Sequence, residues 1–377
     1  MKKVIIILFM LLVSISSVVY AEDRIIEEQK SMLGISDFIK EANKYSEENL
    51  GDMNDILDSA IKGDIDNSNI IKKFLNNITK EVKETIKILG SVLVVIVIHS
   101  ILKSITESLE NENVSKIAYY VQYILIVTLV MSNFSEIVNL IKNTIQNLVG
   151  FMNSLLPILL TLMIATGNIT TASTIQPIIL FAITFIGNSI IYVILPVLLV
   201  STALAIISKI SDKVQIDKLA KYFKSSIVWF LGIILTIFVG VVSIEGTLTS
   251  NVDGITAKTA KTAVSSLIPV VGKILGDSID SVIGCTSILK GAVGIVGVLV
   301  IISISIMPII KIAVLSMSYY LTSALAQPIA DKKITSLLEQ IGDTFKIMLG
   351  ILFAISTMLI IGTTLVIKIS NSGLMYR

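Results

Sequence analysis

Residues Ile175 to Ser208 read IQPIILFAITFIGNSIIYVILPVLLVSTALAIIS, and none of these 34 side chains carries a charge. A helix needs about 20 predominantly apolar residues to cross the hydrocarbon core of a bilayer, so lipid is the solvent that suits this stretch. The run is too long for one ordinary pass and short for two, and Gly187-Asn188-Ser189 interrupts it. We expect a tight hairpin of short helices, or one helix followed by a re-entrant piece.

Apolar runs continue on both sides of this stretch. A second over-long run, Ile288–Pro328, has an internal break at Pro308 and Lys311. The sequence therefore predicts an all-α polytopic membrane protein, with about seven to nine transmembrane helices between Ile88 and Ile369. Runs of the length of one pass occur at 88–106, 117–134, 148–166, 225–244 and 345–367.

The composition agrees with a membrane protein and excludes several other classes. Hydrophobic residues make up 54% of the chain and charged residues 15%, whereas soluble domains have about 25% charged residues. The net charge of +2, without a Lys/Arg tract, argues against a nucleic-acid partner. One cysteine, Cys285, and one histidine, His99, leave little basis for disulfides, zinc sites or a Ser–His–Asp triad. We expect no cofactor and no metal.

The N-terminus has the three parts of a secretory signal peptide, residues 1–21. Met1-Lys2-Lys3 is basic, Val4 to Leu12 is apolar, and Val19-Tyr20-Ala21 fits a cleavage site. An uncleaved signal anchor is the alternative. In either case export machinery reads this end first, and we expect residues 22–87 to form an extracytoplasmic segment.

That extracytoplasmic segment, residues 22–87, is polar and helical in pattern. It holds 15 acidic and 10 basic residues, with apolar residues at three- and four-residue spacing. Gly51 and Gly63-Asp64 are typical of helix ends. The segment is either a docking surface for a partner outside the membrane or a small helical cap with solvated charges.

A basic loop orients the membrane domain. Residues 209–224 contain more lysine than aspartate, which places them in the cytoplasm by the positive-inside rule. With the N-terminus outside, five passes must precede this loop, so the run 175–208 would have to cross twice. The five lysines are Lys209, Lys213, Lys218, Lys221 and Lys224.

Two related halves are suggested by repeated short motifs. Ser154-Leu155-Leu156-Pro157 returns as Ser266-Leu267-Ile268-Pro269, and Leu231-Gly232-Ile233 returns as Leu349-Gly350-Ile351. Repeated halves are common in transporters and channels. After residues 22–87, the chain divides into the first two transmembrane helices (88–147), a first membrane half (148–253), an amphipathic or re-entrant segment (254–287), a second membrane half (288–369) and a C-terminal tail (370–377).

Prolines lie inside or at the edge of the apolar runs. Membranes tolerate broken helices where protein or a cavity satisfies the freed backbone groups, and such breaks occur at transport sites as well as at structural kinks. The expected helix breaks are Pro157, Pro196, Pro269 and Pro308.

The segment 254–287 holds the candidate gate or partner face. After Pro269, an apolar stripe follows helical spacing, and Lys273, Asp277 and Asp280 share the opposite face. Such a helix would lie at the interface or dip into the bundle with its charges toward water or a partner. A second amphipathic element, Ile334 to Phe345, precedes the final run.

Intramembrane enzymes are disfavoured by missing motifs. Asp277 and Asp343 each follow a glycine, but neither lies in the Gly-x-Gly-Asp of intramembrane aspartyl proteases. Neither a rhomboid-type Gly-x-Ser-Gly nor a phosphate-binding loop occurs. We therefore expect no catalytic residues.

Three stretches carry a resemblance to a known family. Asn113–Tyr120, Ser154–Leu162 and above all Lys258–Gly284, with its Pro269-Val-Val-Gly and Gly276-Asp277, resemble stage III sporulation protein AE of endospore-forming Firmicutes. The similarity covers nearly the whole mature chain and is weakest in residues 22–87. Lys273 departs from the small residue usual in the family, so a role for that position transfers less well.

The resemblance implies a multi-pass protein of the mother-cell membrane around the forespore. It implies a secretion-like complex with other stage III A-operon proteins, including a cytoplasmic ATPase, that reaches stage II sporulation protein Q indirectly and sustains late forespore development. The first function is thus a non-enzymatic component of a transenvelope channel. A stand-alone secondary transporter is the alternative, and an intramembrane enzyme is third.

Overall fold

The computed structural model describes the chain in four main ranges, and every described residue is in a helix or in a turn between helices. The all-helical architecture expected from the sequence is therefore confirmed for these parts, which contain no strand. The side chains of residues 245–280 lie outside the description. The described residues are 26–63, 112–210, 216–267 and 271–372, with 79, 82–83, 86, 90, 93–98, 100–101 and 104–105.

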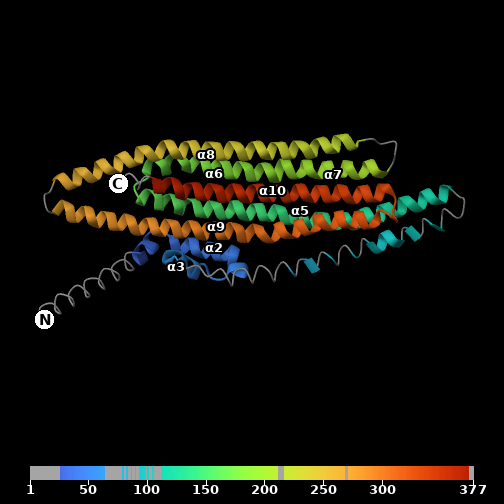
Figure 1. The fold of residues 1–377 in the computed structure, drawn as a ribbon, viewed down its shortest axis with the longest axis horizontal. Helices are drawn as coiled ribbons and strands as arrows, with labels where there is room; N and C mark the ends of the chain where they lie inside the picture. Colours follow the sequence, from blue (N-terminus) through green and yellow to red (C-terminus); the bar gives the residue numbers. More distant parts are fainter. Residues whose placement is uncertain are drawn as a thin grey trace.

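The body of the molecule is a bundle of long helices that lie side by side (Figure 1). Successive long helices run in opposite directions along the bundle, with α6, η1 and α7 in line as one rod. The α7–α8 and α9–α10 turns lie at the same end of the bundle, and the α8–α9 hairpin projects beyond the other end. The elements are α5 (Glu112–Ala165), α6 (Ile169–Ser189), the π-helical turn η1 (Ile190–Ile194), α7 (Leu195–Ile210), α8 (Asp217–Leu267), α9 (Val271–Ala326) and α10 (Lys332–Ser372).

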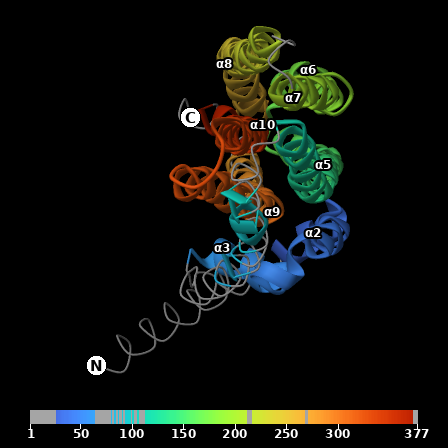
Figure 2. The same cartoon turned by 90° about the vertical axis from the view of Figure 1, so that its right-hand side faces the viewer.

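Helix α10 forms the axis of the bundle. Viewed along the helices, it lies in the middle, with α8, α9 and α5 around it (Figure 2). It contacts α5, α6, α7, α8 and α9. Its buried residues recur every three or four positions, and this spacing keeps one broad apolar stripe against its neighbours.

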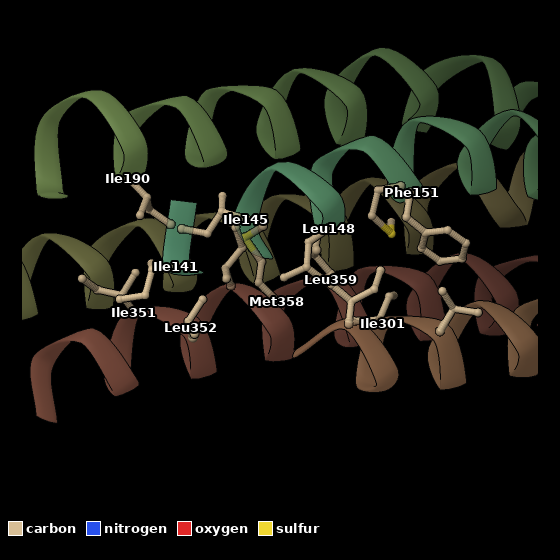
Figure 3. Close-up of a cluster of buried hydrophobic side chains, with 14 of the residues drawn as sticks. Ile141, Ile145, Leu148, Phe151, Ile190, Ile301, Ile351, Leu352, Met358 and Leu359 are labelled. Atoms are coloured by element: carbon tan, nitrogen blue, oxygen red, sulfur yellow. The ribbon is translucent and has the colours of Figure 1, made fainter. Parts of the chain in front are cut away.

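The core is aliphatic and continuous along the bundle. In its central part, isoleucine, leucine and methionine side chains from four elements meet, and all are almost fully buried (Figure 3). Each buried aliphatic side chain contributes about 1.5–3 kcal/mol where water is the alternative solvent. Within lipid, close packing rather than water exclusion holds such helices together. The labelled residues are Ile141, Ile145, Leu148 and Phe151 of α5, Ile190 of η1, Ile301 of α9, and Ile351, Leu352, Met358 and Leu359 of α10.

The prediction that residues 175–208 form a hairpin, or a helix with a re-entrant piece, is wrong. The chain does not reverse there: α6, η1 and α7 form one rod. Gly187 is helical and buried, and a Cβ at this position would lie 2.6 Å from Val149 Cγ2. The glycine thus permits close packing against α5. The π-helical turn η1 ends two residues before Pro196, and Leu195 N–H donates to Ile190 O across it. This wider i→i+5 bonding lies next to the position where Pro196 has no N–H to donate.

Two further runs also continue through the places where breaks were expected. The run 288–328 lies in the single helix α9 up to Ala326, and this helix passes through Pro308. Lys311 forms an ion pair with Glu136 of α5 at 3.1 Å. Pro157 lies inside α5, a helix that joins the runs 117–134 and 148–166. Neither proline ends its helix: α5 continues from Pro157 to Ala165, and α9 continues from Pro308 to Ala326. Membrane helices tolerate proline where local adjustment satisfies the freed backbone group. Pro269 lies outside the described residues.

Five helices in the described part of the chain are long and apolar enough to cross a membrane, where the sequence predicted seven to nine. The run 88–106 lies mostly outside the described residues. The number is lower for two reasons. The runs 117–134 and 148–166 form one helix, α5, and the run 175–208 does not turn back on itself. The five are Phe134–Ala165, Ile169–Lys209, Asp217–Ile244, Ser281–Ala326 and Lys332–Lys368.

Three charge-free stretches of nearly equal length lie side by side in this bundle. They are residues 225–244 of α8, 291–310 of α9 and 347–367 of α10, each bounded by a charged residue at both ends. Gly362 lies against Phe238 and Gly294 against Ile367, so the stretches share one level. Twenty residues of helix span about 30 Å, the thickness of the hydrocarbon core.

A pair of short helices covers one side of the bundle. α2 (Ile35–Leu50) and α3 (Met53–Lys62) lie against α9, and α2 also contacts α5 (Figure 1). The predicted ends at Gly51 and Gly63 are confirmed, since both glycines have positive φ between or after these helices. Asp52 caps α3 by accepting from Asn54 N at 2.9 Å, and this bond lowers the pKa of its carboxyl.

The helix pair is amphipathic and packs through its apolar face. Phe38 and Tyr45 of α2 contact the ring of Phe151 in α5, with centroids 6.0 and 5.9 Å apart. On the outer face, Asp37, Lys40 and Lys44 are exposed. The sequence left open whether this segment is a docking surface or a cap, and its charged face remains uncovered in the single chain.

Candidate functional site at the basic end of the bundle

Four of the five lysines of the predicted cytoplasmic loop lie at the end of the bundle where α7 turns into α8. Lys209 ends α7, and Lys218, Lys221 and Lys224 lie on the first turns of α8. Lys213 lies outside the described residues. We call this region, with the adjacent α9–α10 turn, the basic end.

One lysine of this group closes the turn. Lys209 Nζ lies 2.6 Å from Asp217 Oδ2, and the Ser208 hydroxyl donates to the other carboxylate oxygen. The bonds join the end of α7 to the start of α8. The charge of Lys209 is therefore paired with that of Asp217, while Lys218 and Lys221 are exposed on α8.

Lys221 and Lys224 meet charged residues of α10 across a groove. The groove has a volume of about 860 Å³, and Asp343 and Lys346 lie on its α10 side. Lys224 crosses to α10 and donates to the Gln340 carbonyl oxygen at 3.0 Å. Asp343 is held from the third helix, α9, by the Tyr320 hydroxyl at 2.5 Å. Three ammonium groups and one carboxylate thus share the mouth of this groove.

Hydroxyl groups fix the helices at this end. Ser201 of α7 donates to Ala220 O of α8 at 2.7 Å, and Ser316 of α9 donates to Gly342 O of α10 at 3.0 Å. Thr202 and Thr344 lie 3.2 Å apart between α7 and α10. Hydrogen bonds of this kind join helices where apolar contact alone gives little preference for one register.

The α10 side of the groove was missed as a site by sequence reasoning. Asp343 entered only as a failed protease motif, and Lys346 was not considered. The available signal was the amphipathic element Ile334 to Phe345, whose exposed face includes Asp343. What the sequence could not give was its pairing with α8, because about 120 residues separate the two segments.

The other predicted site, Lys273, Asp277 and Asp280, has side chains that lie outside the described residues. Its backbone belongs to the first turns of α9, in the projecting hairpin with α8 (Figure 1). The hairpin extends beyond the bundle rather than dipping into it. As a gate or partner face, this position stays a prediction.

The described part of the chain contains no cluster of side chains that could hold a metal ion. Within those ranges, no three His, Cys, Asp or Glu side chains gather as a metal site would require. Cys285 is buried and forms no disulfide with the described part of the chain, and the His99 side chain lies outside the described residues.

Comparison with known proteins gives the family. The sequence profile of stage III sporulation protein AE matches residues 52–370, from the N-cap of α3 to the last turns of α10. The chain belongs to the stage III sporulation protein AE family. A relative of that name from Bacillus subtilis (strain 168) is 30% identical over 307 residues, which cover 81% of this chain and 77% of the relative. No solved structure matches.

Membership in the stage III sporulation protein AE family confirms the resemblance seen in the sequence. The family match includes the basic end, the groove and the whole helical bundle, whereas α2 precedes it. Together with five apolar helices of spanning length, the family makes this chain a sporulation membrane protein.

Proposed function

We propose that this protein is a non-enzymatic, multi-pass component of a secretion-like channel complex that links the mother cell and the forespore. The observation that carries the proposal is the exposed charged face of α2. The apolar face of α2 packs on Phe151, inside the membrane-spanning part of α5, so lipid does not suit these charges and a protein partner would cover them. A self-sufficient transporter has little need of such a surface, while a component of an assembly needs one for a partner. The family, whose name places its relatives in stage III of sporulation, supports this context.

The proposed orientation puts the basic end in the cytoplasm of the mother cell. Lysine exceeds aspartate and glutamate there, and the positive-inside rule then applies. Three crossings would precede the basic end: the run 88–106, α5 and the α6–η1–α7 rod. The sequence analysis required five crossings before the basic end. Three crossings are also an odd number, so they end on the same side of the membrane. An exported N-terminus and a cytoplasmic basic end therefore remain compatible.

The two sides of the membrane would serve different partners. A cytoplasmic ATPase of the same stage III A-operon would engage the basic end, where Lys218 is exposed. Other stage III A-operon proteins, and through them stage II sporulation protein Q in the forespore membrane, would be reached from the α2–α3 side. The projecting α8–α9 hairpin lies at the end opposite the basic end and is a second candidate contact (Figure 1).

A stand-alone secondary transporter is the weaker proposal. Substrate sites of transporters use helices unwound near mid-membrane, with polar groups facing the site. The rod α6–η1–α7 departs from α-helix only at the π turn. A pocket of about 350 Å³ between α6 and α8 is lined by aliphatic and phenylalanine side chains such as Phe181, Ile234 and Phe238. It offers no polar group to a solute.

The test uses the protein in its own sporulating host. We expect Lys40→Glu with Lys44→Glu to abolish most heat-resistant spores and late forespore reporter activity, because the partner surface reverses its charge. Protein level and membrane fraction should not change. The matched control keeps the charge, as Lys40→Arg with Lys44→Arg, and should sporulate normally. Normal sporulation of the charge-reversed variant would refute a partner role for this face.

A further inference from the structure

The groove between α8 and α10 changes character along its length. Its mouth is lined by Lys221, Lys224, Asp343 and Lys346, and its remainder by apolar side chains such as Leu235 and Ala354. A cavity of about 860 Å³ lies in the range of small-molecule sites, which are about 300–1,000 Å³. A ligand that fills it must have a polar end and an apolar body.

The mouth of the groove carries excess positive charge. Lys221 and Lys346 form no ion pair or hydrogen bond with the residues that the structure describes. Lys224 reaches a backbone carbonyl oxygen, and Asp343 accepts a hydrogen bond from Tyr320 on its α9 side. Three lysines against one aspartate leave two positive charges in excess. An anionic group would neutralise them without displacing an existing bond.

The depth of the groove fits a lipid. The charge-free stretches of α8 and α10 begin directly after Lys224 and Lys346, and each spans about 30 Å. The lysines therefore lie at the level of phospholipid headgroups, with the apolar part of the groove at the level of acyl chains. Trp229, on the groove and 71% exposed, has the position that tryptophan favours at this interface.

Two glycines keep the groove open. Gly232 of α8 and Gly350 of α10 both line it, and a Cβ at either would meet no atom within 4 Å. They are the central residues of the two Leu-Gly-Ile copies, brought to the same groove by parallel helices. Any larger side chain would occupy the space that a chain of methylene groups could fill.

We propose that this groove binds one anionic phospholipid. Its phosphate lies among the ammonium groups of Lys221, Lys224 and Lys346, and an acyl chain lies over Gly232 and Gly350. Basic pockets between membrane helices bind anionic headgroups in this way, and each lysine near the surface contributes about fivefold to the preference. The site needs no partner protein, so it stands independently of the proposed channel role.

The experiment uses the single tryptophan of the chain, Trp229, as the reporter. The full-length protein is placed in nanodiscs of phosphatidylcholine with a small fraction of brominated phosphatidylglycerol or brominated phosphatidylcholine. Bromine quenches a nearby indole. We expect stronger quenching by the anionic lipid at equal fraction, because the lysines at the mouth of the groove favour an anionic headgroup beside Trp229. Equal quenching by the two lipids would overturn the proposal.

Variants separate the two ends of the site. Lys221→Gln with Lys346→Gln should remove the preference for phosphatidylglycerol, by about thirtyfold for two lysines. Gly350→Leu should reduce quenching by filling the groove. Gly240→Leu is its control, because Gly240 also has open space but lies outside the groove. A preference retained by the double lysine variant would overturn the headgroup assignment.

A final arm distinguishes a lipid from a free anion. Millimolar inorganic phosphate or glycerol phosphate is added to the wild-type nanodiscs. An unchanged preference for brominated phosphatidylglycerol supports the lipid. Loss of that preference at constant ionic strength would show that the lysines select a soluble phosphate, and the proposal of a lipid site would then be wrong.

Discussion

The basic end and the opposite, apolar half of the bundle are held together by different contacts. At the basic end, hydroxyl groups cross between helices, as from Ser316 to Gly342 O and from Ser323 to Thr335 O. In the apolar half, which we define as residues 145–163, 291–304 and 352–366, glycines allow close approach. A Cβ at Gly297 would lie 2.7 Å from Leu155 Cδ2.

The difference follows from the solvent around each region. Within the hydrocarbon core no hydrophobic drive acts between helices, so small residues and close packing determine their association. At the basic end, charged residues bring water to the helices, and polar groups gain from fixed partners. The molecule thus has a region specified by hydrogen-bond geometry and a region specified by shape.

The largest effect should come from the aromatic cluster of the basic end. Phe345 is fully buried, and its ring lies 5.7 Å from that of Phe134 and 5.4 Å from that of Tyr319. Phe345→Ala should lower the free energy of unfolding by about 3–5 kcal/mol. Thermal unfolding of the detergent-solubilised protein measures this. Phe353→Ala, on the same helix but 62% exposed, should change little. Similar losses at both positions would contradict the proposed core.

A smaller loss should come from widening a close contact between α9 and α5. Gly297→Val places a branched side chain against Leu155, and overpacking of this kind costs about 1–3 kcal/mol. Gly291→Val is the control, because a Cβ at Gly291 meets no atom within 4 Å. Thermal unfolding in detergent again compares the pair. An equal shift in the two variants would mean that close packing does not specify the apolar half.

The smallest effect should come from a single hydroxyl. Ser316→Ala removes the bond to Gly342 O, and interhelical hydrogen bonds in membrane proteins contribute about 0.6 kcal/mol on average. Ser305→Ala removes only bonds within the same helix, to Ile301 O and Ile302 O. Differential scanning calorimetry of both variants would detect the difference. A larger loss for Ser305→Ala would reverse the assignment of this contact.

Much of the fold could be predicted because its signals are local. Apolar runs gave the helices, Gly51 and Gly63 gave two helix ends, and the family motifs gave the family. Gly187 and Pro308 were misread for a physical reason: the residues that interrupt a helix in water serve packing or are tolerated when other helices surround them.

The groove was not predictable from the sequence. The lysines of α8 were recognised as basic, but their position opposite Asp343 and Lys346 depends on how α8 and α10 lie together. Periodicity identifies the face of a helix and not its neighbour. The Leu-Gly-Ile copies were noticed as a repeat, yet only the structure brings Gly232 and Gly350 to the same groove.

The central position of α10 has a consequence for biosynthesis. This helix contacts the long helices before it, α5 to α9, yet it leaves the ribosome after them. Chains are made at about 5–20 residues per second, so α5 to α9 wait several seconds or more without their axis. During that interval their inner faces must be covered by lipid or by the insertion machinery. Truncation before Lys332 would therefore leave these inner faces without the helix that covers them in the full-length chain.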